Sequence, residues 1–298
     1  MCGIVGLHLK DHLLHAQLGT LLSPMLEALT VRGPDSAGIA LYGAEAPPDF
    51  LKYSLHSAEA DLDWAALADT LAADSGTVSV TRQYGSVAIV TAAGPAEVFL
   101  NRLATTAPDV RVVGFGSAME VYKDIGTPEQ ICARYDVADF AGYQGIGHTR
   151  LATESAVTTE HSHPFAPDAD LGLVHNGSFS NHATLRRRLQ DNGCHFDTDN
   201  DSEVAARYIA DRLHRGDDLG DALRMVLKEF DGFFTLLVST RTQFAVVRDA
   251  FACKPLVVAE TAEYVAVASE YHALATLPGI EQAAVREPQP EEVHVWSR

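Results

Sequence analysis

The chain opens with Met1-Cys2-Gly3-Ile4-Val5-Gly6, a cysteine at position 2 followed by small and apolar residues. Removal of the initiator methionine would place the thiol and a free α-amino group on the same residue, Cys2. An α-amino group has a pKa of about 7.7–8.0, so near neutral pH it can act as the general base for an adjacent nucleophile. The same six residues also suit an ordinary apolar strand. The stretch therefore predicts either an N-terminal nucleophile or a plain first strand.

Composition indicates a folded protein with a sizeable core. The chain has 298 residues, of which 47% are hydrophobic and 21% charged, which fits one large α/β domain or two domains of ordinary size. Its 22 basic and 40 acidic residues give a net charge of −18. Basic runs are absent from the sequence, so binding to nucleic acid or to an anionic membrane surface is not expected.

The cysteines are widely spaced and form no C-x-x-C pair, which argues against a disulfide framework or a zinc site. No apolar run approaches the ~20 residues of a membrane helix, and no basic region precedes an apolar core at the N-terminus. We therefore expect a cytoplasmic protein in a reducing compartment. The four cysteines are Cys2, Cys132, Cys194 and Cys253.

Residues 44–145 differ in character from the flanking sequence and are predicted to form an inserted α/β unit within a domain that spans 1–298. Alternating and amphipathic patterns give the order β-α-β-β-α-β of a ferredoxin-like sandwich. The unit contains no cluster of histidines, cysteines or carboxylates that looks catalytic, which leaves docking, regulation or packing as its role. The expected strands are 50–56, 77–81, 86–91 and 110–115, and the helices are 62–73 and one that starts at Pro95.

The flanking sequence predicts stacked antiparallel sheets with helices outside. It has strand patterns near both ends, and helices are expected at 18–29, 183–192, 201–214 and 219–230.

Three polar positions interrupt this apolar pattern. Arg150 ends a strand-like segment, where a guanidinium either grips a carboxylate or lies at the surface. Asn176-Gly177 ends another apolar strand and is either a tight turn or an amide and a backbone N–H aimed at an oxyanion. Asp201 begins a helix, where it caps the helix, binds an ammonium group, or does both.

Five motifs in this order over nearly the whole chain resemble those of the class II glutamine amidotransferases, which are N-terminal nucleophile hydrolases. The resemblance implies an α+β fold, a four-layer αββα sandwich, which here carries the inserted unit. It also implies glutamine as the substrate, and neither a metal nor an organic cofactor on this chain. The motifs are Met1 to Gly6, Arg32-Gly33-Pro34-Asp35, Gly147-His148-Thr149-Arg150-Leu151-Ala152-Thr153, His175-Asn176-Gly177 and Asn200-Asp201-Ser202-Glu203.

The resemblance assigns catalytic roles to Cys2, Asn176 and Gly177. Cys2 would attack the side-chain amide of glutamine with its own α-amino group as base. The Asn176 amide and the Gly177 backbone N–H would hold the tetrahedral oxyanion. Water would then resolve a γ-glutamyl thioester to glutamate.

The substrate would be bound by four further residues. Arg150 would bind the α-carboxylate of glutamine and Asp201 its α-ammonium group. Arg32 would support the surroundings of the nucleophile, and Thr153 would lie in the substrate-binding segment.

The sequence departs from the family pattern at two positions of that segment. Many relatives have Thr-Arg-Trp-Ala-Thr-His there, whereas this chain has Leu151 and Glu154 in place of the Trp and His. These residues are expected to change how the loop closes over glutamine.

The final strands end at Arg298, and no P-loop, sugar-phosphate or flavin segment follows. The inserted unit is placed as in the amidotransferase domain of glutamate synthase. We therefore expect a stand-alone amidotransferase subunit of a glutamate synthase-like or N-methylglutamate synthase-like hetero-oligomer, whose partner carries FMN and iron–sulfur clusters. The alternatives are an independent γ-glutamyl amidase or glutaminase, and a catalytically weakened regulatory or scaffolding subunit.

Overall fold

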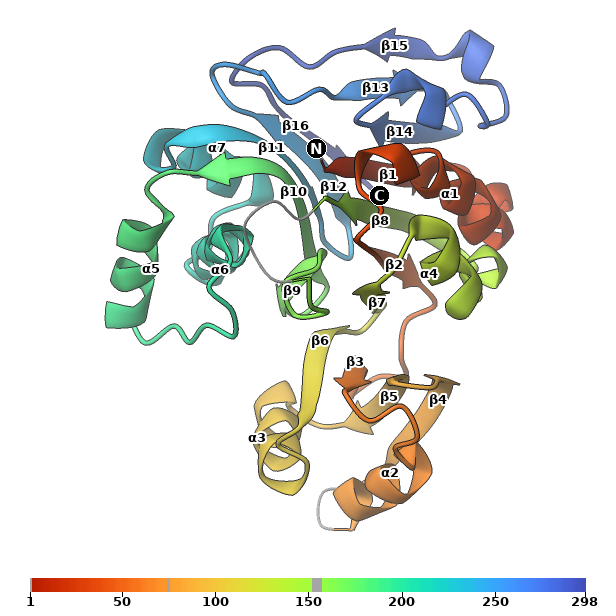
Figure 1. Cartoon of the computed structure of the whole chain (residues 1–298), viewed down its shortest axis with the longest axis vertical. Helices are drawn as coiled ribbons and strands as arrows, with labels where there is room; N and C mark the ends of the chain where they lie inside the picture. Colours follow the sequence, from red (N-terminus) through yellow and green to blue (C-terminus); the bar gives the residue numbers. More distant parts are fainter. Residues whose placement is uncertain (1, 74–75, 152–156) are drawn as a thin grey trace.

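A computed structural model describes residues 2–73, 76–151 and 157–298. Their strands form three sheets in which the paired strands are antiparallel (Figure 1). The largest has seven strands, and the N-terminal strand lies at its centre. In spatial order these are β15 (Ala284–Arg286), β13 (Val257–Glu260), β14 (Tyr264–Ala268), β1 (Gly3–Leu9), β8 (Gly142–Arg150), β2 (Ser36–Gly43) and β7 (Met119–Ile125).

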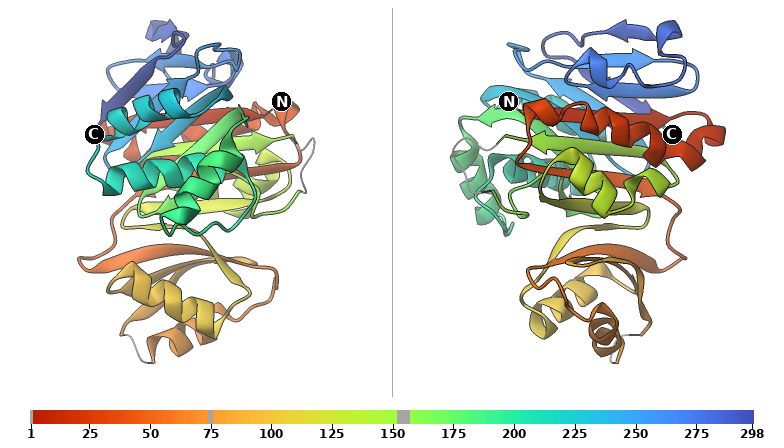
Figure 2. Two further views of the ribbon diagram at one scale, coloured as in Figure 1. Left: turned by 90° about the vertical axis from the view of Figure 1, so that its left-hand side faces the viewer. Right: turned by 45° about the vertical axis from the view of Figure 1, so that its right-hand side comes forward.

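A five-stranded sheet packs against the first, and helices cover the outer face of each sheet (Figures 1 and 2). Its strands in order are β16 (Val293–Ser297), β12 (Gln243–Arg248), β11 (Gly232–Ser239), β10 (Leu171–Phe179) and β9 (Phe165–Asp168). The helices on the seven-stranded sheet are α1 (Leu18–Glu27) and α4 (Pro128–Arg134), and those on the five-stranded sheet are α5 (His182–Asp191), α6 (Asp201–His214) and α7 (Leu219–Glu229). This is the predicted four-layer αββα sandwich.

The first strand shows how the layers form. Alternate residues of a strand point to opposite faces of its sheet. Val5 and Leu7 pack in the apolar core under α1 and α4, whereas Ile4 packs in the core between the two sheets. A Cβ on Gly6 would lie 2.5 Å from Leu237 of the other sheet, so glycine lets the sheets approach closely. All seven residues of β1 are buried, which explains why the strand reads as a continuous apolar run.

The third sheet belongs to the inserted unit, and its ferredoxin-like order is confirmed. Two helices, α2 (Trp64–Ala72) and α3 (Ala96–Thr106), pack with it around a separate apolar core. The chain order is β-α-β-β-α-β, as the sequence predicts. In spatial order the strands are β4 (Val78–Tyr84), β5 (Val87–Ala93), β3 (Phe50–Ser57) and β6 (Val110–Gly116).

The ferredoxin-like sheet and its helices occupy a shorter range than the predicted insertion of 44–145. β7 pairs with β2 in the seven-stranded sheet, and α4 packs in the same layer as α1. The sequence pattern did not predict β7 as a strand, because charged residues occupy buried positions in it. Glu120 is 4% exposed and accepts a hydrogen bond from Lys52 at 2.8 Å, and Lys123 is 5% exposed.

Asp170 ties the inserted unit to the sandwich. Its carboxylate accepts hydrogen bonds at 2.9 Å from the backbone N–H groups of Ser117, Ala118 and Met119, in the turn between β6 and β7. The Asp170 N–H donates to the carbonyl of Phe115 at 2.9 Å. Several charge-assisted bonds at one buried carboxylate fix the exit of the chain from the unit.

The remaining elements are short 3₁₀ helices. None of the described helices is long and apolar enough to cross a membrane. The 3₁₀ helices are η1 (His12–Gln17), η2 (Thr30–Arg32), η3 (Val137–Asp139), η4 (Tyr271–Ala273) and η5 (Ile280–Gln282).

Candidate active site

Three predicted site residues point into the space between the two large sheets. Because side chains alternate along a strand, Arg150 shares a face of β8 with Ile146, and Asn176 shares a face of β10 with Val174. Ile146 and Val174 both belong to the core between the sheets. Cys2 directly precedes β1 and lies two residues before Ile4. By the same alternation, the Cys2 side chain faces the core between the sheets, as that of Ile4 does. The thiol, the guanidinium and the amide therefore belong to one layer.

Backbone contacts between the strands place Cys2, Arg150 and Asn176 at the same end of the layer between the two sheets. Gly3 lies opposite Thr149 in the pairing of β1 with β8. The Nε2 atom of His148 lies 3.1 Å from the carbonyl oxygen of His175, which directly precedes Asn176. A carbonyl only accepts, so His148 carries its proton on Nε2. This bond links β8 to β10 across the layer.

Arg32 fixes the backbone of the candidate nucleophile. Its Nε donates to the carbonyl oxygen of Cys2 at 3.0 Å, and its Nη1 forms a short ion pair with Glu270. Arg32 is 9% exposed, so both interactions are shielded from water. On the other side, the N–H of Ile4 donates to Ser269 Oγ at 3.0 Å. Two hydrogen bonds thus hold the backbone at Cys2, one to its own carbonyl and one from the nearby Ile4 N–H, and Cys2 itself is half-buried.

Arg150 is buried, with 6% of its surface exposed, so the alternative of a surface arginine is wrong. The loop that follows Arg32 runs directly over it. A Cβ on Gly33 would lie 2.5 Å from the carbonyl carbon of Arg150, and the N–H of Asp35 donates to the Arg150 carbonyl at 3.1 Å. The turn-forming residues of this loop therefore allow its backbone to lie close to the end of β8.

Asn176-Gly177 is not a turn, because β10 continues through it and pairs with β11 as far as Phe179. Gly177 has φ of 149°, and a Cβ there would lie 1.9 Å from the carbonyl oxygen of Phe233. Only glycine fits this backbone. Asn176 is 3% exposed, and its Nδ2 has no hydrogen-bond partner among the described residues. A buried amide donor without a partner is costly unless a ligand takes the bond.

Asp201 is not the cap of α6. Asn200 caps the helix, and its side-chain oxygen accepts from the N–H of Ser202 at 2.8 Å. The carboxylate of Asp201 instead accepts from the N–H of Phe179 at 2.8 Å, and its side chain is 21% exposed. Asp201 thus joins the start of α6 to the end of β10 and keeps acceptor capacity for a ligand.

Thr153 and Glu154 lie outside the described residues, so the structure does not place them. Leu151 is described and is 38% exposed.

Sequence reasoning missed a group of three buried histidines beside these residues. The rings of His148 and His163 stack with centroids 4.1 Å apart, and His163 meets the edge of Phe165 at 4.9 Å. His175 faces the helix layer, where its Nδ1 lies 2.8 Å from Ser202 Oγ. No group of three potential metal ligands forms among the described residues. For His148 and His175, the signal that could have revealed them was the presence of histidine in otherwise apolar strands.

Burial keeps these histidines neutral. It lowers the pKa of His148 to about 3, and it lowers the pKa of His163 well below the ordinary value. The cations Lys123 and Arg150 act on His163 in the same direction. The pKa of His175 is also lowered by burial, although Asp201 opposes this shift. These three histidines therefore add no positive charge near Arg150 at pH 7.

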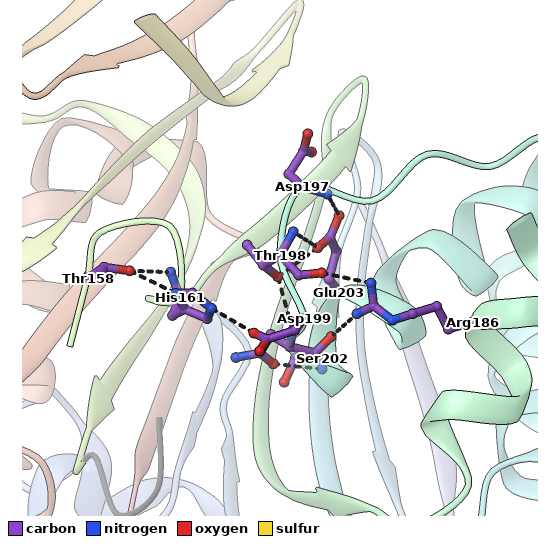
Figure 3. A network of polar contacts seen from close by, with 9 residues as sticks. Thr158, His161, Arg186, Asp197, Thr198, Asp199, Ser202 and Glu203 are labelled. Atoms are coloured by element: carbon purple, nitrogen blue, oxygen red, sulfur yellow. Dashed lines mark hydrogen bonds and ion pairs between the residues drawn. The ribbon is translucent and has the colours of Figure 1, made fainter. Parts of the chain in front are cut away.

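Polar contacts outside the layer connect the segment before β9 with the start of α6 (Figure 3). His161 Nε2 lies 2.8 Å from Asp199 Oδ1. Arg186 of α5 donates to the carbonyl oxygens of Thr198 at 2.7 Å and Asn200 at 3.1 Å. These contacts position the residues that lead into Asp201.

Comparison with known proteins agrees with this geometry. Residues 148–276 match the model of the family described as "Glutamine amidotransferase domain". The chain is 51% identical over 299 aligned positions to the glutamine amidotransferase-like protein GlxB of Rhizobium meliloti (strain 1021), covering 99% of this chain and 98% of that protein. The chain belongs to the class II glutamine amidotransferases.

More distant relatives match over part of their length. An amidophosphoribosyltransferase of Methanocaldococcus jannaschii is 32% identical over 54% of this chain and 35% of that protein. The solved glutamine phosphoribosylpyrophosphate amidotransferase from B. subtilis superposes with a TM-score of 0.63 at 20% identity, covering 99% of this chain. The chain spans about half of that solved protein, 47%. This likeness agrees with the αββα fold.

Ser269 and Glu270 are further site residues to which the sequence alone assigned no role. They lie together directly after β14. Their contacts with Ile4 and Arg32 explain why the end of the chain is needed to hold its beginning.

A first prediction concerns the pH dependence of stability and the variant His163→Phe. A histidine whose pKa is lower in the folded than in the unfolded state stabilises the fold fully above pH ~6.5, and this contribution falls as the pH decreases. Each such group changes the free energy of unfolding by at most about 1.4 kcal/mol per pH unit. Urea unfolding at pH 7.5 and pH 5 should therefore show a large loss in the wild type and a smaller loss in His163→Phe.

Phenylalanine preserves the ring contacts with His148 and Phe165 and cannot be protonated. Equal pH slopes for the two proteins would contradict the assignment of a neutral buried histidine at position 163.

Proposed function

We propose that the chain hydrolyses glutamine to glutamate and ammonia, with Cys2 as the nucleophile after removal of Met1. The proposal is supported above all by the unpartnered, buried amide of Asn176, which faces the same layer as Cys2. Such a donor is suited to the negative charge that develops when a thiolate attacks a carbonyl carbon. The family of the chain agrees with this chemistry.

In the proposed reaction the Cys2 thiol gives its proton to its own α-amino group as Sγ attacks the amide carbon of glutamine. Asn176 Nδ2 and the Gly177 N–H stabilise the oxyanion. When the tetrahedral intermediate collapses, the carbon–nitrogen bond breaks and the α-ammonium group returns the proton to the departing ammonia. Water then attacks the thioester, releases glutamate and restores the thiol.

The charged residues of the site suit the two ends of the substrate. The buried guanidinium of Arg150 would bind the α-carboxylate, and Asp201 would bind the α-ammonium group. Arg32 would act on the nucleophile through the Cys2 carbonyl. Thr153 remains a proposed member of the substrate-binding segment.

We further propose that the ammonia passes to a separate glutamate synthase-like or N-methylglutamate synthase-like subunit that carries FMN and iron–sulfur clusters. This part of the proposal is supported by the position of the ferredoxin-like unit between the segments of Arg32 and Arg150, where the glutamate synthase amidotransferase domain also has an insertion. It implies a cytoplasmic hetero-oligomer.

The nucleophile is tested with Cys2→Ala and with a glutamine analogue that carries an electrophilic ketone. We expect Cys2→Ala to lose glutamine hydrolysis while its circular dichroism and unfolding midpoint stay close to those of the wild type, because the thiol is not part of the apolar core. Mass spectrometry of the wild type should show loss of Met1 and one equivalent of label. The exposed Cys253 supplies the matched control Cys253→Ala, which should be fully active. Retained hydrolysis in Cys2→Ala would refute the role of the thiol.

The oxyanion site is tested with Asn176→Ala. Removal of one oxyanion donor typically lowers kcat by ~10²–10³-fold, and we expect a decrease of that size with a smaller effect on KM. Stability should change little, because the amide nitrogen makes no bond among the described residues. Asn192→Ala, at the exposed end of α5, is the control. An unchanged kcat would remove Asn176 from the mechanism.

The partner is tested by purification of the tagged chain from its native host. We expect a complex with flavin and iron–sulfur absorbance, and we expect the isolated chain to hydrolyse glutamine more slowly than the complex. Isolation without any partner, together with rapid hydrolysis by the chain alone, would favour an independent glutaminase.

A further inference from the structure

A cleft of about 430 Å³ lies where the ferredoxin-like unit meets the sandwich. One wall comes from β6 and α3, and the other comes from β9 and the residues before and within α6. Its size is in the range of small-molecule sites. Figure 1 shows β6 passing from the inserted unit toward β9 along this boundary.

Three charged residues of the wall, one cation and two carboxylates, pair with one another. Arg207 donates to Asp197 at 2.5 Å and to Glu203 at 2.6 Å. Glu203 also accepts from the N–H groups of Asp197 at 2.9 Å and Thr198 at 2.8 Å (Figure 3). This group is satisfied without a ligand.

Two cations of the wall are not neutralised in this way. Within the part of the chain that the structure describes, neither Lys123 nor Arg111 has a carboxylate at ion-pair distance. Lys123 is 5% exposed and donates to the carbonyl oxygens of Ser162 at 2.8 Å and Pro164 at 3.2 Å. An ammonium group has three donors, so one remains. Glu160 is the remaining carboxylate of the wall and is exposed.

A buried ammonium without a counter-ion is unfavourable. In agreement with this, burial lowers the pKa of Lys123 to about 8. Glu160, Glu203 and Asp197 act on Lys123 from beyond ion-pair distance, so a carboxylate in the cleft would supply a direct counter-ion.

The cleft also offers apolar surface and free backbone groups. Val112 and Phe115 of β6 and Phe165 of β9 line it. β6 is the last strand of its sheet, so one row of its backbone N–H and C=O groups is not used by strand pairing.

We propose that this cleft binds a small organic acid, with its carboxylate held by Lys123 and Arg111 and its apolar body packed on Val112, Phe115 and Phe165. Amino acids and 2-oxo acids with aliphatic side chains both have a carboxylate and an apolar body. Only the amino acids also have an ammonium group, for which Glu160 is the available partner. The test distinguishes the two classes by this group.

The position of the cleft connects it to the candidate active site. Asp197 and Thr198 line the cleft, and the next residues, Asp199 to Asp201, lead to the carboxylate proposed to bind glutamine. Lys123 holds the carbonyls on either side of His163, which stacks on His148. An acid in the cleft is therefore expected to change the KM for glutamine, an effect that rests on the proposed function, whereas binding itself does not.

The test is isothermal titration calorimetry of the full chain without glutamine. The probes are 4-methylpentanoate, 4-methyl-2-oxopentanoate, L-leucine and the neutral 4-methylpentanamide. At least one acid should bind, and the amide should bind at least about tenfold more weakly than 4-methylpentanoate, because hydrogen bonds from the two cations are stronger to a carboxylate than to a neutral amide. Stronger binding of L-leucine than of the 2-oxo acid would assign the ammonium contact.

Arg111→Gln removes one of the two cations at an exposed position, so it should fold like the wild type and weaken acid binding by about tenfold. The control is Arg224→Gln on the exposed face of α7, remote from the cleft lining, and it should bind like the wild type. The proposal is overturned if no acid binds at millimolar concentration, if acid and amide bind equally, or if Arg111→Gln keeps the wild-type affinity. Failure of glutamine hydrolysis alone would leave these binding results unaffected.

Discussion

The structure depends on the packing of two sheets face to face, with β1 at the centre of one of them. Burial of both faces of β1 is the constraint that the other layers satisfy. Helices cover Val5 and Leu7, and the five-stranded sheet covers Ile4 and Gly6. Each fully buried aliphatic side chain contributes roughly 1.5–3 kcal/mol, so the strand is strongly held. A residue attached directly to such a strand, Cys2, is therefore fixed in position by the core itself.

At one end the same layer changes from apolar to polar, and this change creates the site. Buried polar groups need partners. The histidines meet this requirement in part by remaining neutral, and Arg32 meets it in part through Cys2 and Glu270, while its Nη2 has no partner among the described residues. Asn176 keeps a donor that no described residue takes. The end of the layer is thus built with hydrogen-bonding capacity directed at a molecule that is not part of the fold.

Much of the fold follows from the sequence, because long periodic elements such as α6 and the apolar run of β1 obey their patterns. The predictions that failed concern residues whose partners are distant in the chain. β7 was missed since Glu120 and Lys123 are buried through contacts with other elements. Asn176-Gly177 suits a turn locally, yet pairing with β11 extends the strand. The family motifs predict individual site residues, whereas the contacts of Glu270 and the histidines required the tertiary structure.

The inserted unit is attached where it can affect the site without taking part in it. β7 returns from the unit and pairs with β2 at the edge of the seven-stranded sheet, and Val87 and Ile89 of the unit pack in the apolar core on the helix side of that sheet. Lys123, on that same strand, donates to the segment that carries His163. Asp170 fixes the turn before β7 from the side of β10, the strand of Asn176. Lys123 lies toward the end of β7 that is level with Arg150, whereas Asp170 binds the opposite end of β7. A shift of the unit would therefore act on the two ends of the sheets through different hydrogen bonds, and also through the apolar contacts of Val87 and Ile89.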